Sequence, residues 1–149
     1  MELTDLSLLG RIVSLDPGMK RVGLAVTDVD QTIATPQPRI ERTSWKRLLS
    51  SVQAILNEFD AAALVIGLPL ESDGSDGPMT SEARDIARKF ALSLAIPVFL
   101  QDERVTSYEA KSRMWEQGLS LEEAKKNVDS EAASIILSDF LDRLATARR

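Results

Sequence analysis

Two short segments of this 149-residue chain have the apolar character of buried strands, and they constrain its fold more than any other feature. Residues 11–16 have the sequence RIVSLD, and residues 63–68 have the sequence ALVIGL. Short, continuous apolar runs of this kind are typical of strands that are buried on both faces of a sheet. We therefore expect a sheet with helices packed against it.

The hydrophobic pattern predicts three strands at the start of the chain. Residues 22–27 alternate as a second strand should, and they are expected to form an antiparallel hairpin with residues 11–16. A weaker third strand over residues 32–35 is expected to end at Pro36 and Pro38, because proline cannot continue a hydrogen-bonded ladder.

The rest of the chain alternates helices and strands. Apolar spacing or a capping-box pattern predicts the helices, and short apolar runs predict the strands. The expected helices span residues 44–59, 80–95, 106–117 and from about 129 onward, with strands at 63–68 and 97–100, a polar, Gly-rich loop at 71–78 and a short helical turn at 120–123. This order implies parallel pairing of the later strands, in one domain over residues 11–149 that follows an extension of residues 1–10.

The chain contains no cysteine and no histidine. Their absence excludes a disulfide framework, a thiolate zinc site, Ser-His or Cys-His catalysis, and metal binding through imidazole. Any metal must therefore be held by oxygen ligands. The 23 acids and 18 Lys and Arg give a net charge of −5, which argues against a strongly basic coat for nucleic acid but allows a local basic groove.

The sequence also predicts a cytoplasmic protein. No run approaches the length of about 18 apolar residues that indicates a membrane-spanning helix. Glu2 and Asp5 stand where a signal peptide would carry a basic segment followed by an apolar one.

Four acids stand at the ends of predicted elements. Asp16 closes the first strand, and Asp102 and Glu103 follow the last one. Asp129 precedes the buried stripe of the last helix. Ligands usually bind at the carboxyl ends of parallel strands, but each acid also has a structural interpretation. These are turn chemistry for Asp16, a surface ion pair with Arg104 for the Asp-Glu-Arg run, and an N-cap for Asp129.

Three carboxylates that converge repel one another unless a cation neutralises them. Ligand sets made only of oxygen favour Mg²⁺ or Mn²⁺, which activate water and stabilise the leaving oxygen in phosphodiester hydrolysis. The acids therefore predict a site for such a metal, provided that the fold brings three of them together.

Four motifs along the chain together resemble a known family. They are LDPGMKRVGLA at residues 15–25, VIGLP at 65–69 with DGS at 73–75, DERVTS at 102–107, and VDSEAA at 128–133 with IL at 136–137. In this order they resemble the YqgF family of RuvX-type, Holliday-junction-resolvase-like nucleases, whose proposed role is the processing of pre-16S ribosomal RNA. The resemblance spans about residues 11–141, nearly the whole chain.

The resemblance implies an α/β, RNase H-like fold, in which a mixed five-stranded sheet has three antiparallel strands followed by two parallel strands and is flanked by helices. It also implies a metal-dependent nuclease that hydrolyses phosphodiester bonds of structured nucleic acid, with 5′-end maturation of pre-16S ribosomal RNA as the leading role. The implied partners are structured RNA (pre-rRNA) or branched DNA, with ribosomal particles as a further candidate and no membrane. The protein would act as a monomer or a homodimer.

The resemblance assigns the family's acidic triad to Asp16, Glu103 and Asp129, which would be both catalytic and the ligands of one or two Mg²⁺ or Mn²⁺ ions. More distant RNase H-like enzymes carry an acid at the end of the middle strand, where this chain has Gly67. Glu103 is therefore assigned as the second carboxylate, with Asp102 as the fallback.

The family's basic positions fall on Lys20, Arg21 and Arg104, which are expected to bind nucleic acid by neutralising flanking phosphates. For Lys20 and Arg21 the structural alternative is a solvated hairpin tip. The loop from Gly74 to Gly77 is expected to approach the nucleic-acid backbone closely, because glycine leaves room for it.

Three other functions stay open. A Holliday-junction resolvase would use the same site on branched DNA, and a non-catalytic RNase H-like module would dock nucleic acid without cleaving it. The Asp-x-Gly at Asp16 and Gly18, followed by a hairpin, also resembles the first phosphate loop of sugar kinases and Hsp70-type ATPases. Those enzymes close two lobes around ATP, whereas this chain has the length of one lobe.

Overall fold

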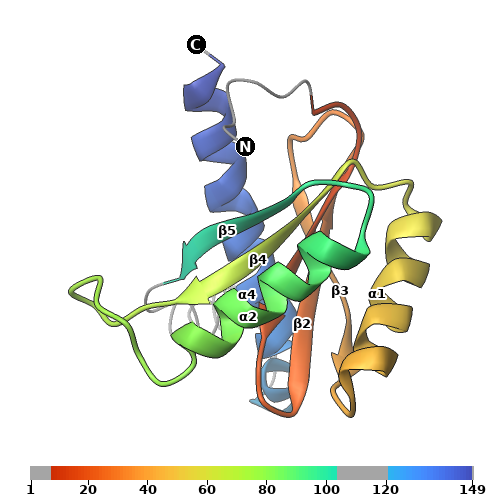
Figure 1. Ribbon diagram of the computed structural model, residues 1–149. Helices are drawn as coiled ribbons and strands as arrows, with labels where there is room; N and C mark the ends of the chain where they lie inside the picture. Colours follow the sequence, from red (N-terminus) through yellow and green to blue (C-terminus); the bar gives the residue numbers. More distant parts are fainter. Residues whose placement is uncertain (1–7, 104–120, 149) are drawn as a thin grey trace.

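The computed structural model describes residues 8–103 and 121–148, except for the side chains of residues 121–129. Within these residues, five strands form one sheet and three helices pack on it (Figure 1). In chain order, the elements are β1 (Ile12–Pro17), β2 (Arg21–Thr27), β3 (Ala34–Glu41), α1 (Trp45–Glu58), β4 (Ala63–Pro69), α2 (Thr80–Ser93), β5 (Val98–Glu103) and α4 (Leu121–Ala147).

The strands lie in the order β3-β2-β1-β4-β5. The first three pair antiparallel, and β4 pairs parallel with both β1 and β5. The expected mixed sheet, three antiparallel strands followed by two parallel ones, is therefore confirmed. The two apolar segments of the sequence form β1 and β4, which lie side by side in the interior of the sheet.

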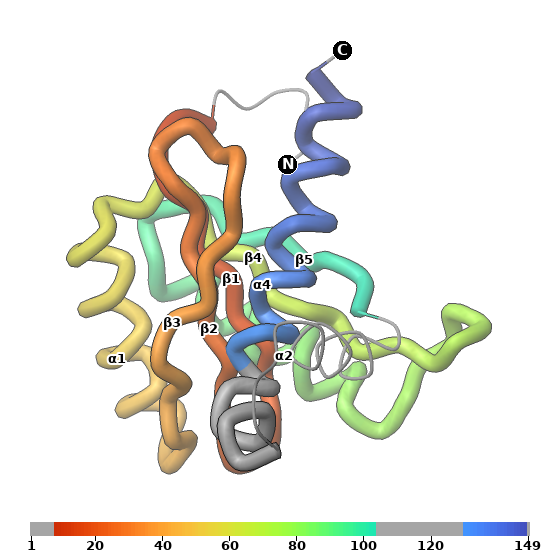
Figure 2. The backbone as a smooth tube through the Cα atoms, turned by 180° about the vertical axis from the view of Figure 1, so that it is seen from behind, coloured from red at the N-terminus to blue at the C-terminus, as the bar shows by residue number. Residues whose placement is uncertain are grey.

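Helices cover both faces of the sheet. Figure 1 shows α1 and α2 in front of the sheet, and the view from behind in Figure 2 shows α4 crossing the opposite face. Side chains of β1 alternate between the two layers: Val13 and Leu15 pack with α1 and α2, whereas Ile12 packs with α4. This alternation explains why β1 and β4 are apolar at successive positions.

The expected helix at residues 44–59 is confirmed as α1. The Ser44 side chain accepts a hydrogen bond of 3.2 Å from the Arg47 N–H, which satisfies one of the unpaired amides at the helix start. Its buried residues Leu48, Val52 and Leu56 are four apart, so they form one stripe against the sheet.

The third strand differs from its prediction. It was expected to end at Pro36, but β3 continues through Pro36 and Pro38 to Glu41. The physical reason is its position, because β3 is an edge strand that needs ladder hydrogen bonds on one side only. A shift of register between Val22 and Leu24 on the partner strand accompanies this segment.

The last helix also differs. A short helical turn at 120–123 and a separate helix from Asp129 were expected, but one continuous helix, α4, begins at Leu121. Asp129 therefore lies inside the helix, and its predicted role as an N-cap is wrong. The expected helix at residues 106–117 lies outside the described residues.

The start of the described chain packs against the end of α4. Leu8 is buried in the cluster beneath this helix, and Arg148 donates a hydrogen bond of 2.7 Å to the Leu8 carbonyl. The division between an extension of residues 1–10 and a domain of residues 11–149 stays a prediction. In the described part of the chain, no helix is long and apolar enough to cross a membrane.

We predict that Phe90→Ala lowers the free energy of unfolding by about 3–5 kcal/mol, as truncation of a buried aromatic ring typically does. Phe90 is fully buried, and its ring packs edge-on against Trp45 with centroids 4.7 Å apart. The matched control is Leu92→Ala on the same helix, where the side chain is 83% exposed and the change should stay within about 0.5 kcal/mol. Urea unfolding measures both, and equal effects would contradict the assigned core.

Candidate active site

Asp16 lies near the carboxyl end of β1, opposite Gly23 of β2. Because side chains alternate along a strand, Asp16 faces the same side of the sheet as Ile12 and Ser14, which is the side covered by α4. Asp16 is partly exposed, so it lies at the rim of the packed layer rather than within it.

The last strand extends further than expected, and this extension decides which acid faces Asp16. β5 was predicted to end at Leu100 but continues to Glu103. Glu103 is on the same face as Phe99, which packs with α4, whereas Asp102 is exposed and alternates to the opposite face. The structure therefore brings Glu103, and not Asp102, to the side of Asp16.

The carboxyl groups of Glu103 and Asp16 interact directly. Burial, the charge of Asp16 and a hydrogen bond between the two side chains raise the pKa of Glu103 to about 10, in that order of importance. Each cause disfavours a second negative charge at this point. At neutral pH the two carboxyl groups therefore share one proton, and together they carry one negative charge instead of two.

Gly67 on β4 leaves the space that the Glu103 carboxyl group occupies. A Cβ atom at position 67 would lie 2.7 Å from Oε2 of Glu103 and 2.6 Å from Cδ1 of Ile136 on α4. Both separations are shorter than a van der Waals contact. β4 has no side chain here, and the Glu103 carboxyl group of the neighbouring strand β5 fills the position instead.

Two serine hydroxyl groups fix α4 against the strands that lead to Asp16. Ser14 donates a hydrogen bond of 2.7 Å to the Ala133 carbonyl, and Ser130 accepts a longer one of 3.4 Å from the Leu24 N–H. Leu24 lies next to the strand position that pairs with Asp16. The backbone of residue 129 therefore lies at the same end of the sheet as Asp16, and its side chain is outside the described residues.

We call the end of the sheet that holds Asp16 and Glu103 the carboxylate end. Among the side chains that the structure describes, no group of three acids lies close enough to hold a metal ion together. The structure thus brings together two members of the predicted triad.

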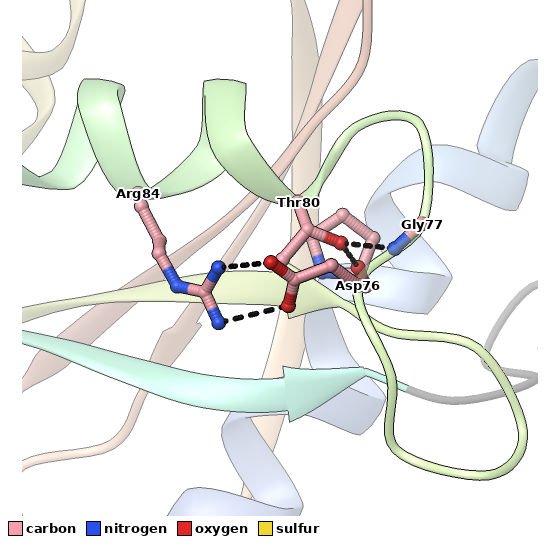
Figure 3. Close-up of polar contacts among 5 residues, drawn as sticks. Asp76, Gly77, Thr80 and Arg84 are labelled. Carbon is pink, nitrogen blue, oxygen red and sulfur yellow. Dashed lines mark hydrogen bonds and ion pairs between the residues drawn. The ribbon is translucent and has the colours of Figure 1, made fainter.

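The Gly-rich loop between β4 and α2 is held by hydrogen bonds at its base (Figure 3). The Thr80 hydroxyl group donates to the Pro69 carbonyl and accepts a hydrogen bond of 2.7 Å from the Gly77 N–H. Arg84 forms two parallel hydrogen bonds, of 2.8 and 3.1 Å, with the Asp76 carboxylate, and this pair lowers the pKa of Asp76. The loop is therefore held in place by contacts with the start of α2.

Two of the three predicted basic residues lie beside the carboxylate end. Lys20 and Arg21 are exposed where the β1–β2 hairpin turns, and with Gly18 and Met19 they line a shallow hollow of about 260 Å³. Arg104 lies outside the described residues.

Sequence reasoning missed three structural roles at this site. Ser14 was visible as a polar residue inside an apolar strand, which indicates that its hydroxyl group has a partner. Thr80 was visible as a helix start after Gly-Pro. Gly67 was noted only as the absence of an acid, and only the tertiary structure shows that Glu103 lies over it.

The fold matches solved structures of Holliday junction resolvases. One is Thermus thermophilus RuvC in complex with a Holliday junction, with a TM-score of 0.57, 18% identity, and coverage of 92% of this chain and 97% of that one. Another is the fowlpox virus Holliday junction resolvase, with a TM-score of 0.52, 17% identity, and coverage of 89% and 99%. At this identity the likeness shows the fold alone, which is the RNase H-like fold of the RuvC-type resolvases.

Sequence comparison identifies the family within this fold. The family model described as "RuvX: Holliday junction resolvase" matches residues 10–143. A protein of Anaeromyxobacter sp. (strain Fw109-5), named "Putative pre-16S rRNA nuclease", is 40% identical over 132 residues, which are 89% of this chain and 96% of that protein. A protein of the same name from Maridesulfovibrio salexigens is 40% identical over 133 residues, with coverage of 89% and 98%. The chain belongs to the RuvX (YqgF) family.

Gly67→Ala is predicted to destabilise the protein by about 1–3 kcal/mol, because the added methyl group overpacks the space shared by Glu103 and Ile136. The matched control is Gly77→Ala, whose Cβ would meet only the end of the flexible Glu71 side chain, at 2.8 Å. We expect the control to cost less than about 1 kcal/mol in urea unfolding. A Gly67→Ala protein as stable as the control would show that Glu103 does not occupy this space.

The raised pKa of Glu103 predicts stability that decreases as the pH rises. The unfolded chain releases this proton near the ordinary pKa of 4.5, whereas the folded protein keeps it to about pH 10. The favourable contribution of Glu103 is therefore complete below pH 4.5 and is lost progressively as the pH rises towards about 10. Because glutamine is neutral throughout, Glu103→Gln should gain stability relative to wild type between about pH 5 and about pH 9.

Urea unfolding in EDTA at several pH values measures this difference. Asp16→Asn serves as a second variant, because it removes the neighbouring negative charge and should reduce the pH dependence of wild type. Parallel stability curves for wild type and Glu103→Gln would contradict the shared proton.

Proposed function

We propose that this protein is a metal-dependent nuclease that hydrolyses phosphodiester bonds in structured RNA, with the 5′ end of pre-16S ribosomal RNA as its substrate. The observation that carries the proposal is the contact between Asp16 and Glu103, which places two carboxyl groups together at the carboxylate end of the sheet. Such a pair costs stability unless a cation or a proton neutralises it, so its presence favours a functional role over a structural one.

The residues at this site fit Mg²⁺ or Mn²⁺. Their donor atoms are carboxylate oxygens, which these hard cations prefer, and the chain has no cysteine or histidine that would favour a softer metal. The proton shared by Asp16 and Glu103 marks the position where positive charge is needed. We propose Asp16, Glu103 and Asp129 as the ligands and catalytic residues. When bound, the metal supplies activation of water and neutralisation of charge on the phosphate.

The course of α4 supports Asp129 as the third acid. The hydrogen bond between the Ser130 hydroxyl group and the Leu24 N–H holds the helix backbone beside the strand position next to Asp16. The helix backbone at position 129 therefore lies in the turn of α4 that reaches the carboxylate end, where we propose that Asp129 completes the set of acids.

The protein's own residues would orient the substrate. Lys20 and Arg21 are exposed beside the carboxylate end, and we propose that they and Arg104 pair with phosphates that flank the cleaved bond. The loop after β4, which Thr80 and the Asp76–Arg84 pair hold in place, also begins at the carboxylate end. There the Leu70 N–H donates a hydrogen bond of 3.2 Å to the Glu103 carbonyl.

The choice of RNA rests on the relatives, several of which carry the name of a pre-16S rRNA nuclease. The second candidate is branched DNA, which the family description and the RuvC complex with a Holliday junction favour. We propose residues 11–149 as the catalytic unit and the cytoplasm as the place of action, with ribosomal particles as a candidate partner.

Asp16→Asn and Glu103→Gln are each predicted to reduce cleavage of a pre-16S RNA fragment in Mn²⁺ by more than about a hundredfold, because even outer-shell changes at metal sites cost 10- to 100-fold. The matched control is Asp102→Asn, which removes a neighbouring carboxylate on the opposite face and should retain most of the activity. Cleavage is measured as initial rates on gels, with a four-way DNA junction assayed in parallel.

The outcomes separate the candidate functions. Faster cleavage of the junction than of the RNA would favour a resolvase. Loss of activity in Asp102→Asn but not in Glu103→Gln would show that Asp102, and not Glu103, is the second carboxylate of the site. Binding of RNA by wild type without any metal-dependent cleavage would favour a non-catalytic module.

A further inference from the structure

Two segments that are distant in the sequence form one basic surface. Residues 17–21 contain Lys20 and Arg21, and residues 39–47 add four more cations. We call this surface the basic corner, and its cations are Lys20, Arg21, Arg39, Arg42, Lys46 and Arg47. The two segments hold six of the chain's 18 Lys and Arg but only one of its 23 acids, Glu41. They carry a net charge of +5 within a chain of net charge −5.

Direct contacts join the two segments. The Arg42 N–H donates to the Lys20 carbonyl at 2.8 Å, and the Arg42 guanidinium group donates to the Gly18 carbonyl at 2.9 Å. Arg21 also lies directly opposite Glu41 in the register of β2 and β3. The hairpin tip is itself tight, because a Cβ atom at Gly18 would lie 2.5 Å from the Arg21 carbonyl oxygen. The backbone that carries these cations is therefore firmly placed.

Five of the six cations of the corner divide into two groups. Arg42 pairs with Glu82 at 2.5 Å, and Arg39 pairs with Glu41 at 3.2 Å, so these two contribute to the structure of the surface. Lys20, Lys46 and Arg47 are exposed, and among the described residues none of them forms an ion pair with an acid. Unpaired cations on one surface repel one another, which favours binding of an anion.

The basic corner lies at the same end of the molecule as the carboxylate pair. β3 runs parallel to β1, because both are antiparallel to β2, so Glu41 at the end of β3 and the start of α1 lie at the carboxylate end. Two strand spacings, about 10 Å, separate β3 from β1. Figure 1 shows the hairpin tip and the start of α1 together at the bottom, with the C-terminus at the top.

The aromatic residue in the corner argues against recognition of a single strand. Single-stranded nucleic acid is usually bound by aromatic rings on which bases stack. Trp45 is half-buried and packs edge-on against Phe90, and the Lys89 ammonium group lies 5.7 Å from the centre of its ring. Among the described residues, the corner offers charge without a free stacking surface, which suits the phosphate backbone of a duplex.

We propose that the basic corner binds the phosphate backbone of a double-stranded arm of the substrate, beside the bond that is cleaved. The proposal deepens the proposed nuclease function, on which the identity of the substrate rests. It adds Lys46 and Arg47 as direct phosphate contacts and gives Arg42 the role of a positioning residue that joins the hairpin tip to α1.

The test measures binding without cleavage. The full chain is titrated into a fluorescent, blunt RNA duplex longer than about 16 base pairs, in EDTA and at several salt concentrations. Lys46→Gln/Arg47→Gln should weaken binding by about fivefold or more. It should also lower the slope of log affinity against log salt concentration by about 2, which is close to one per lost phosphate contact. Both positions are exposed in the first turn of α1, and glutamine is a good helix former, so the variant should fold.

The matched control is Arg143→Gln/Arg148→Gln, which removes the same charge from the opposite end of the molecule and should leave affinity and slope unchanged. Arg143 lies in the C-terminal half of α4, and Arg148 directly follows this helix. Equal affinities for the two double variants would overturn the proposal. A single strand of the same sequence would also overturn the proposal under two conditions: it binds wild type more tightly than the duplex does, and its affinity falls as much as that of the duplex in the Lys46→Gln/Arg47→Gln variant. Because EDTA prevents metal-dependent cleavage, the binding titration does not depend on nuclease activity. The titration can therefore support the basic corner even if no cleavage is found, and an unchanged affinity in the titration would not contradict the nuclease proposal.

Discussion

The burial of β1 and β4 on both faces is the constraint on which the rest of the structure depends. An apolar strand pair in the interior of a sheet requires a layer of helices on each side, and α1, α2 and α4 supply these layers. The polar exception in β1, Ser14, gives its hydroxyl proton to α4 at Ala133 and so positions this helix. The charged groups of the site lie where the strands end, at Asp16 and Glu103.

The carboxylate end therefore combines two opposed requirements. Packing with α4 brings Glu103 into partly buried surroundings, and the charge of Asp16 adds to the cost of ionising it. Gly67 makes the arrangement possible by leaving space for the Glu103 carboxyl group. The basic corner balances this end with positive charge, and it lies across the first strands of the sheet rather than among the acids. A polyanionic substrate could contact both without bringing cations and carboxylates into direct competition.

Local patterns predicted the elements well where burial follows a simple period. The spacing of Leu48, Val52 and Leu56 located α1 to within a residue at each end. Pattern reasoning failed at β3, because the effect of Pro36 and Pro38 depends on whether the strand lies at an edge. It also divided α4 in two, because a capping pattern shows where a helix can begin but not whether the preceding turn is already helical.

The sequence by itself determined the chemistry that is available: oxygen ligands in a chain without cysteine or histidine, acids at element ends, and the motifs of the RuvX family. Only the tertiary structure decided which side chains meet. Alternation along β5 directs Glu103 and not Asp102 towards Asp16, and the length of that strand could not be read from its apolar residues. The tertiary structure also places Arg42 and Lys46 on the same surface as Lys20. Contacts between residues far apart in the chain depend on strand order and register, which local sequence does not encode.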